Sequence, residues 1–257
     1  MTSNLSATPA APLRGRTALV TGGGSGIGRA CARALADAGA AVHVVDRDGD
    51  SAKAVAEETG GQPHAVDLAD AAALATLPRE VDVLVNNAGL QHVAPITAFP
   101  PDRFELIQQV MVTAPFLLLR HTLPHMYAGR WGRVVNVSSV HGLRASAYKS
   151  AYVAAKHALE GLSKVAALEG APHGVTSNCV NPGYVRTPLV EGQLQDQAAA
   201  HRITPDQVLT DVLLARSPVK RLLEPEEVAG AVLWLCGPHA ASVTGVSLPL
   251  DGGWTAG

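Results

Sequence analysis

The sequence has few aromatic residues, few cysteines and almost no excess of charge. Aromatic residues make up 4% of the 257 residues, and charged residues make up 16%. Lysine and arginine number 20 against 22 aspartate and glutamate, so the formal net charge is −2. Nucleic acids and anionic membrane surfaces attract basic proteins, and this chain has no basic excess. We therefore expect a small-molecule partner, and neither a nucleic acid nor a membrane.

The three cysteines are Cys31, Cys179 and Cys236, and no apolar run is long enough to cross a bilayer. The cysteines are widely separated in apolar stretches, which is typical of buried free thiols and of neither disulfides nor metal ligands. Residues 1–13 lack the basic start and apolar run of a signal peptide. We expect a flexible tail over residues 1–13, no metal site, and a cytoplasmic location.

Apolar residues nevertheless make up 47% of the chain, which is enough for a sizeable core. Short β-branched runs alternate with longer helical patterns, and strands that are apolar on both faces indicate a parallel sheet covered by helices. The sequence predicts an α/β protein: one Rossmann-type, doubly wound parallel sheet over residues 14–257, with helices on both faces. The expected strands are Thr17–Val20, Ala41–Val45, Val81–Val85, Val134–Val137, Val175–Val180 and Val246–Leu250; the helical stretches are Arg29–Ala38, Ala52–Glu58, Phe104–Met126, Tyr152–Leu168, Pro205–Ala215 and Pro225–Leu235.

The stretch Leu189–Ser217 is the least strand-like part of the chain. It carries Gly192, several glutamines and an alanine triplet. Such a segment would lie outside the sheet, where short helical pieces can cover a ligand. We predict a helical substrate lid there.

Glycines cluster directly after the first expected strand, in the segment Thr21-Gly-Gly-Gly-Ser-Gly-Ile-Gly28. Glycines let the backbone approach a pyrophosphate closely, and the free N–H groups of the following helix attract its charge. A flexible loop would also be rich in glycine, but the strand before and the helix after favour dinucleotide binding. The residues expected to form this cradle are Thr21, Gly22, Gly24, Ser25, Gly26, Ile27 and Gly28.

An acidic residue, Asp46, ends the next expected strand, 18 residues beyond Gly28. A carboxylate at this spacing accepts hydrogen bonds from both hydroxyls of a ribose and repels a 2′-phosphate. The sequence therefore favours NAD over NADP. The adjacent Arg47 could attract a 2′-phosphate, so use of NADP stays open.

A tyrosine and a lysine, Tyr152 and Lys156, share one face at the start of a predicted helix. A phenol with a pKa of about 10 is a poor base at neutral pH, but a neighbouring ammonium stabilises the phenolate and lowers that pKa. Ser139 follows a strand at the sheet edge where ligands bind, and can hydrogen-bond a substrate oxygen. The same spacing also occurs on solvated helix surfaces, so the glycine loop is what favours Ser139, Tyr152 and Lys156 as catalytic residues.

Further motifs extend this pattern: Asp67, Asn86-Asn-Ala-Gly89, and Pro182-Gly183 with Thr187. With the glycine loop, Ser139 and Tyr152-Val-Ala-Ala-Lys156, they resemble the short-chain dehydrogenase/reductase family over about residues 14–257. The resemblance implies reversible hydride transfer between an alcohol carbon and a nicotinamide, with Tyr152 taking the hydroxyl proton and Ser139 steadying the developing carbonyl.

The resemblance also implies the remaining cofactor contacts. Asp67 and Leu68 are expected near the adenine, and Asn87 to Gly89 beside the adenosine ribose. Lys156 would hold the nicotinamide ribose, and Pro182 to Thr187 would line the nicotinamide end. Beyond the glycine loop, the expected cofactor-binding residues are Asp46, Asp67, Leu68, Asn87, Ala88, Gly89, Tyr152, Lys156, Pro182, Gly183, Val185 and Thr187.

One position departs from the family pattern. The asparagine that helps to hold a water next to the lysine in this family aligns with Met111, when Pro115-Phe116 is the anchor. A thioether accepts hydrogen bonds only weakly, so Met111 cannot take over that function. Gln108, one turn earlier, could substitute, or the proton could leave by another route.

Four polar residues, Gln91, His141, Lys149 and Gln193, fall where the substrate is expected. Two amides, an imidazole and an ammonium suit a small carboxylate, which needs donors and positive charge once it leaves water. Each of them could also be an ordinary loop or half-buried residue. Together with Ser139 and Tyr152, the expected substrate-binding residues are Gln91, His141, Lys149 and Gln193.

Short sequence strings within the family pattern narrow the range of expected substrates. The strings around Gln91, His141, Lys149 and Gln193 are similar to those of bacterial family members that interconvert (R)-3-hydroxybutyrate and acetoacetate. This resemblance implies a homotetramer, and it implies that Tyr184 and Trp254 wall the methyl end of the substrate. Another small hydroxy acid or secondary alcohol stays open as substrate, as does a dinucleotide-binding module without catalysis.

Overall fold

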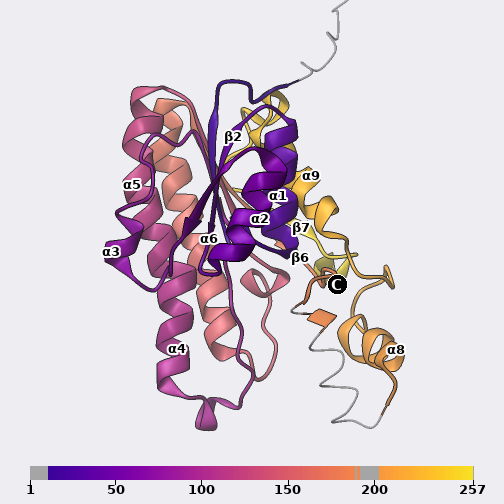
Figure 1. Ribbon diagram of the computed structural model, residues 1–257. Helices are drawn as coiled ribbons and strands as arrows, with labels where there is room; N and C mark the ends of the chain where they lie inside the picture. Colours follow the sequence, from indigo (N-terminus) through magenta and orange to yellow (C-terminus); the bar gives the residue numbers. More distant parts are fainter. Residues whose placement is uncertain (1–10, 189, 192–202, 257) are drawn as a thin grey trace, which may run out of the picture.

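Parallel strands form a seven-stranded sheet in the order β3-β2-β1-β4-β5-β6-β7 (Figure 1). The computed structural model describes residues 11–188, 190–191 and 203–256. Neighbouring strands run parallel throughout the sheet, as strands that are apolar on both faces require. The strands are β1 (Thr17–Thr21), β2 (Ala41–Asp46), β3 (Gln62–Ala65), β4 (Val83–Asn86), β5 (Gly132–Val137), β6 (Val175–Pro182) and β7 (Ser247–Leu250).

Helices cover both faces of the sheet and bury one apolar cluster on each side (Figure 1). Val20 and Val44 pack on one side, and their neighbours Leu19 and Val45 pack on the other, because successive strand residues point to opposite faces. Each fully buried side chain of this kind contributes about 1.5–3 kcal/mol. One face carries α1 (Gly26–Asp37), α2 (Gly49–Thr59) and α9 (Pro225–Cys236); the other carries α3 (Ala71–Leu74), α4 (Pro101–Gln108), α5 (Ala114–Ala128) and α6 (Ser150–Gly170).

The predicted α/β class, with its doubly wound parallel sheet, is confirmed. The sequence pattern missed the edge strand β3 and the short helix α3. The sequence of β3, Gln-Pro-His-Ala, is short and largely exposed, and it contains Pro63. Proline cannot donate to a sheet ladder and is tolerated mainly at an edge, so this segment reads as a loop in the sequence.

The long helical stretch before β5 contains a π-helical turn, Gln109–Thr113, between α4 and α5. Pro115 follows this turn and has no N–H to donate to the carbonyl of Met111, four residues earlier. This missing hydrogen bond gives a physical reason for the wider turn. Met111, in the turn, is 1% exposed.

The described residues of the predicted lid, 190–191 and 203–217, lie outside the sheet (Figure 1). Thr204 caps the short helix α8 (Pro205–Gln207), which continues as the π-helical turn Val208–Leu213. Val208 and Leu213 are buried in a small cluster against which Tyr184 packs. Within the described residues, no helix has both the length and the apolar character to span a bilayer.

Candidate active site

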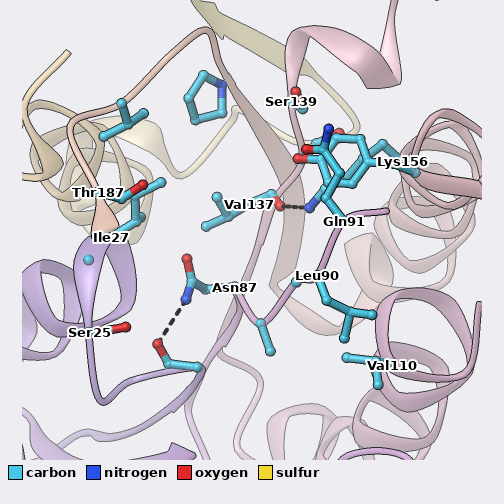
Figure 2. A pocket seen from close by; sticks show the side chains of 18 of the residues that line it. Ser25, Ile27, Asn87, Leu90, Gln91, Val110, Val137, Ser139, Lys156 and Thr187 are labelled. Atoms are coloured by element: carbon cyan, nitrogen blue, oxygen red, sulfur yellow. Dashed lines mark hydrogen bonds between the residues drawn. The ribbon is translucent and has the colours of Figure 1, made fainter. Parts of the chain in front are cut away.

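A cavity of about 570 Å³ opens at the carboxyl edge of the sheet, over β1, β4 and β5 (Figure 2). Strand order reverses between β1 and β4, and ligands of doubly wound sheets bind at this point. Most of the residues predicted to bind cofactor or substrate line this one cavity. They are Gly22, Ser25, Gly26, Ile27, Asp46, Asp67, Leu68, Asn87, Ala88, Gly89, Gln91, Ser139, His141, Lys149, Tyr152, Lys156, Pro182, Gly183, Tyr184, Val185, Thr187 and Trp254.

The glycine loop has the shape of a phosphate cradle. Gly22 has a φ of +62°, and a Cβ there would lie 2.9 Å from the Cα of Ala88. At Gly28, a Cβ would clash with the carbonyl oxygen of Gly22, so helix α1 and the loop can approach this closely only without a side chain. Ser25 makes no side-chain cap at the start of α1, which leaves the first N–H groups of that helix available to a phosphate.

Thr21 and Asn87 hold the loop in place. The Asn87 Nδ2 donates to the carbonyl oxygens of Thr21 at 3.0 Å and Gly22 at 3.1 Å. In return, Thr21 Oγ1 accepts from the backbone N–H groups of Asn87 at 3.0 Å and Ala88 at 3.2 Å. Of the predicted cradle, Thr21, Gly24 and Gly28 do not line the cavity, and they shape the loop from behind.

Asp46 lies at the end of β2, facing the glycine loop. Its Oδ2 accepts from the backbone N–H of Gly24 at 3.0 Å, and its Oδ1 accepts from that of Asp48 at 3.1 Å. Asp48 and Ser51 also line the cavity and were missed by the sequence analysis. Hydrogen bonds from Ser51 hold the pKa of Asp48 below its usual range. Asp48 caps α2 two residues after Asp46, which is the signal that could have placed it at this edge.

Ser139 follows β5, and Tyr152 and Lys156 lie on the first turns of α6, so one cavity contains all three. The Lys156 ammonium donates to the carbonyl oxygen of Val137 at 2.6 Å and lies 5.6 Å from the centroid of the Tyr152 ring. Burial lowers the pKa of Lys156 to about 8. Because the two side chains face the same cavity, the positive charge of the ammonium acts electrostatically on the hydroxyl of Tyr152.

The pKa of Tyr152 moves upward, whereas the sequence analysis expected the ammonium to lower it. Burial is the larger effect and raises the pKa, and a hydrogen bond from Ser139 lowers it only in part. Burial disfavours the charged phenolate more than the polar neighbours favour it.

His141 is buried between Ser139 and the aromatic side chain of Trp254. Its Nε2 lies 3.0 Å from Ser146 Oγ, and its backbone N–H donates to Ser139 Oγ at 3.1 Å. The imidazole ring meets the Trp254 ring edge-on, with 5.3 Å between centroids. Burial, aided by the charge of Lys149, lowers the pKa of His141 to about 3, so the imidazole is neutral at physiological pH.

Lys149 and Gln91 add a charge and a donor to the lining of the cavity. The Lys149 ammonium lies 5.6 Å from the centroid of the Tyr184 ring, and burial lowers its pKa. The Nε2 of Gln91 is buried and has no hydrogen-bond partner within the part of the chain that the structure describes. Gln193, the fourth predicted polar contact, lies outside the described residues.

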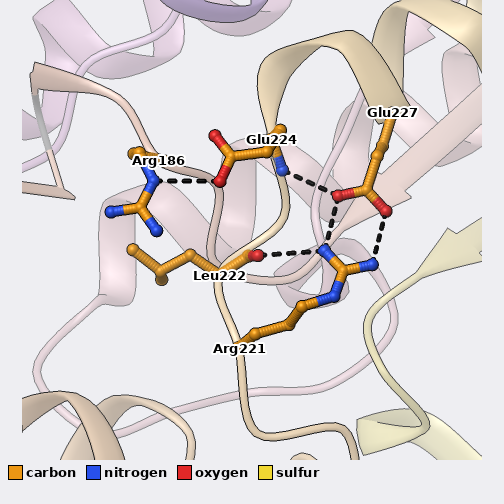
Figure 3. Close-up of polar contacts among 5 residues, drawn as sticks. All are labelled: Arg186, Arg221, Leu222, Glu224 and Glu227. Carbon is orange, nitrogen blue, oxygen red and sulfur yellow. Dashed lines mark hydrogen bonds and ion pairs between the residues drawn. The ribbon is translucent and has the colours of Figure 1, made fainter.

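The segment after β6 is held by a polar cluster at the start of α9 (Figure 3). Arg186 pairs with Glu224 at 3.0 Å, and Arg221 binds Glu227 through two hydrogen bonds of 2.6 and 2.7 Å. Backbone bonds join the same segments, because Arg186 N–H donates to the Leu223 carbonyl at 2.8 Å. These contacts fix the stretch that carries Tyr184, Val185 and Thr187 against the cavity.

Met111 lies behind the glycine of the Asn-Asn-Ala-Gly turn. A Cβ on Gly89 would lie 3.7 Å from the Met111 Cε, which is ordinary contact. Gln108, considered above as a substitute for the missing asparagine, donates its Nε2 to the carbonyl oxygen of Ala151 at 2.9 Å. The apolar wall on this side, Leu90, Leu106 and Val110, was not predicted, because apolar residues carry no sequence signal that separates a cavity wall from the core.

The glycine cradle, the carboxylate on β2 and the Ser139, Tyr152 and Lys156 group together define a dinucleotide-linked oxidoreductase. The family model described as "Enoyl-(Acyl carrier protein) reductase" matches residues 22–255. The chain is 43% identical to the D-beta-hydroxybutyrate dehydrogenase of Rhizobium meliloti (strain 1021), over 94% of this chain and 99% of that protein. It is also 43% identical to the D-beta-hydroxybutyrate dehydrogenase of Cupriavidus necator, over 95% of this chain and 99% of that protein.

Among solved structures, a protein from Agrobacterium tumefaciens with bound NADP matches with a TM-score of 0.85 and 32% identity. This match covers 97% of the present chain and 100% of that one. The chain therefore belongs to the short-chain dehydrogenase/reductase family. The family resemblance seen in the sequence is confirmed, and a nicotinamide cofactor follows from it.

Proposed function

We propose that this protein is an NAD-dependent 3-hydroxybutyrate dehydrogenase that interconverts (R)-3-hydroxybutyrate and acetoacetate. The observation that carries the proposal is the convergence of Lys149, His141 and Gln91 on the cavity that also contains Ser139 and Tyr152. The names of the relatives from Rhizobium meliloti and Cupriavidus necator support the same substrate.

The polar end of the cavity suits a short carboxylate. Lys149 supplies positive charge, the buried Nε2 of Gln91 supplies a donor, and the neutral His141 supplies a ring N–H in one tautomer. A carboxylate that leaves water needs such a set of donors and charge. Gln193 is proposed as a further donor, and Tyr184 and Trp254 would pack against the methyl end of the substrate.

The residues of the cavity fit a dinucleotide, and the nicotinamide supplies the hydride acceptor when it is bound. In oxidation, the phenolate of Tyr152 would take the hydroxyl proton, and the carbon that bears the hydroxyl would lose its hydride to the acceptor, so that the alcohol becomes a ketone. Ser139 Oγ hydrogen-bonds the reacting oxygen and holds it against Tyr152. The Lys156 ammonium stabilises the phenolate and is proposed to bind the ribose hydroxyls.

The position of Asp46 supports NAD rather than NADP. Its carboxylate is tied to Gly24 at the rim of the cradle, so its charge would face a 2′-phosphate on the adenosine ribose. We propose the roles of Asp67, Leu68, Asn87 to Gly89, and Pro182 to Thr187 as the sequence analysis describes them, since these residues line the same cavity.

A homotetramer in the cytoplasm belongs to the same proposal. Phe116 on α5 and Val165 and Leu168 on α6 are exposed apolar residues on neighbouring helices, at 50%, 51% and 78%. Apolar surface of this kind is typical of contacts between subunits. Light scattering of the purified protein would measure its mass in solution.

The test is NADH formation by the purified protein given NAD and (R)-3-hydroxybutyrate. The (S)-enantiomer, 2-hydroxybutyrate and a neutral secondary alcohol serve as comparison substrates. Rapid turnover of the (R)-acid alone is the expected result. Turnover of another compound only would reject the substrate, and NAD binding without any turnover would favour a non-catalytic module.

A further inference from the structure

A buried carboxylate lies behind the catalytic group. Glu160 is 6% exposed and follows Lys156 by one turn of α6. Its Oε1 accepts from the Nδ2 of Asn181 on β6 at 2.5 Å, and its Oε2 accepts from the Oγ of Ser247 on β7 at 2.6 Å. Glutamate is almost never buried to this extent without partners. Here the carboxylate joins helix α6 to two neighbouring strands.

Asn181 connects this carboxylate to the catalytic serine. Its Nδ2 donates one hydrogen bond to Glu160 and another, of 3.0 Å, to the backbone carbonyl oxygen of Ser139. The turn that follows Ser139 packs against the same carboxylate. A Cβ on Gly142 of this turn would lie only 2.8 Å from Glu160 Oε1. The backbone that carries Ser139 therefore depends on Glu160 both through Asn181 and by direct packing.

Glu160 also acts on Lys156 through its charge. Burial lowers the pKa of Lys156 to about 8, and the negative charge of Glu160 opposes this effect and raises that pKa. Cys179, the other group nearby, is a buried thiol whose pKa is raised by burial, so it carries no charge at neutral pH. A carboxylate at this place thus favours the ammonium form of Lys156 near physiological pH.

We propose that Glu160 is a positioning residue of the active site: it aligns Ser139 through Asn181 and places a negative charge behind Lys156. Neither function requires contact with substrate or cofactor. The choice of (R)-3-hydroxybutyrate as assay substrate rests on the proposed function. The positioning of Ser139 and Lys156 by Glu160 would apply to any substrate of this site.

The main test is Glu160→Gln, which keeps the size and the acceptor oxygen of the side chain and removes its charge. We expect kcat to fall about tenfold, with little change in KM for NAD. We also expect the alkaline limb of the kcat profile to move to lower pH, because Lys156 loses its proton earlier. Glu169→Gln, at the exposed end of the same helix, is the matched control and should behave as wild type.

Asn181→Ala separates alignment from charge, because it cuts the link to Ser139 and leaves the carboxylate in place. We expect a lower kcat with an unshifted pH profile. This variant also tests the alignment if Glu160→Gln does not fold. A wild-type kcat in Asn181→Ala would overturn the alignment, and an unshifted profile in Glu160→Gln would overturn the effect of the charge.

A double-mutant cycle in urea unfolding tests the charge without any substrate. Glu160→Gln and Lys156→Met should be coupled at about pH 6.5, where Lys156 is charged, and much less at about pH 10. Equal coupling at both pH values would overturn the electrostatic function. If wild type does not oxidise (R)-3-hydroxybutyrate, the proposed function fails, and this cycle still decides the inference.

Discussion

The ammonium of Lys156 donates a hydrogen bond of 2.6 Å to the backbone carbonyl oxygen of Val137, the last residue of β5. This bond joins the first turns of α6 to the carboxyl edge of the sheet. One of the three N–H groups of the ammonium makes this bond, so two stay available as donors. Helix α6 is thereby held against the strand that leads into Ser139.

Tyr152→Phe should lower turnover strongly, because we propose that the phenol oxygen exchanges the substrate proton. General acid–base groups contribute about 10²- to 10⁴-fold, and we expect a loss of kcat in that range. Binding of NADH, measured by its fluorescence, should persist, since the ring and its packing stay. A variant that retained most of its kcat would show that another group transfers the proton.

Lys149→Ala should raise KM for a hydroxy acid far more than for a neutral secondary alcohol. The reason is that we propose the Lys149 ammonium to pair with the carboxylate, which the neutral alcohol lacks. We expect at least a tenfold rise for the acid, which corresponds to about 1.4 kcal/mol of lost binding. Lys164→Ala, on the exposed face of α6, is the control. Equal effects on both substrates would reject the carboxylate pocket.

Asp46→Ala should increase the use of NADP relative to NAD. Removing the carboxylate removes its repulsion of a 2′-phosphate and leaves Arg47 free to attract it. The measurement is the ratio of kcat/KM for the two cofactors. Asp50→Ala, an exposed acid on α2 outside the cavity, serves as the control. An unchanged ratio would mean that other residues select the cofactor.

His141 should make the folded protein sensitive to acid. Its pKa is about 3 in the folded protein against an ordinary value of 6.5. Below about pH 6.5 the imidazole is therefore protonated in the unfolded chain and still neutral in the folded protein. Stability supplied by the neutral imidazole is therefore lost as the pH falls from about 6.5 toward 3. His141→Gln should flatten this decline in urea unfolding experiments, while His239→Gln, at an exposed position, should not. The same decline in His141→Gln as in wild type would assign it to other groups.

Met111→Asn should change the pH profile of kcat or raise kcat, because an amide at this position can hold a water near Lys156 and a thioether cannot. The side chain is 1% exposed, so we also expect a loss of about 2–4 kcal/mol of stability. Measurements of kcat from acid to alkaline pH test the first expectation. An unchanged profile in a folded variant would show that the proton leaves by another route.

The glycine loop and the pair formed by Tyr152 and Lys156 could be singled out from the sequence because each combines residue types with a fixed local spacing. Tyr152 and Lys156 share a helix face, and the glycine loop lies between a strand and a helix. Both arrangements depend only on residues that are close in the sequence. Leu106 was missed, because its place in the cavity depends on elements brought together from distant parts of the chain, whereas the cap residue Asp48 carried a local signal that was not used.

Local sequence patterns determined the βα alternation, the glycine cradle and the position of Asp46 at a strand end. The tertiary structure decided three further points. Burial turned the pKa of Tyr152 upward where a neighbouring lysine alone would lower it. Folding placed Glu160 of α6 against Asn181 and Ser247, residues of two strands far along the chain. Desolvation and long-range contacts arise only when separate elements pack, so no local pattern in the sequence can specify them.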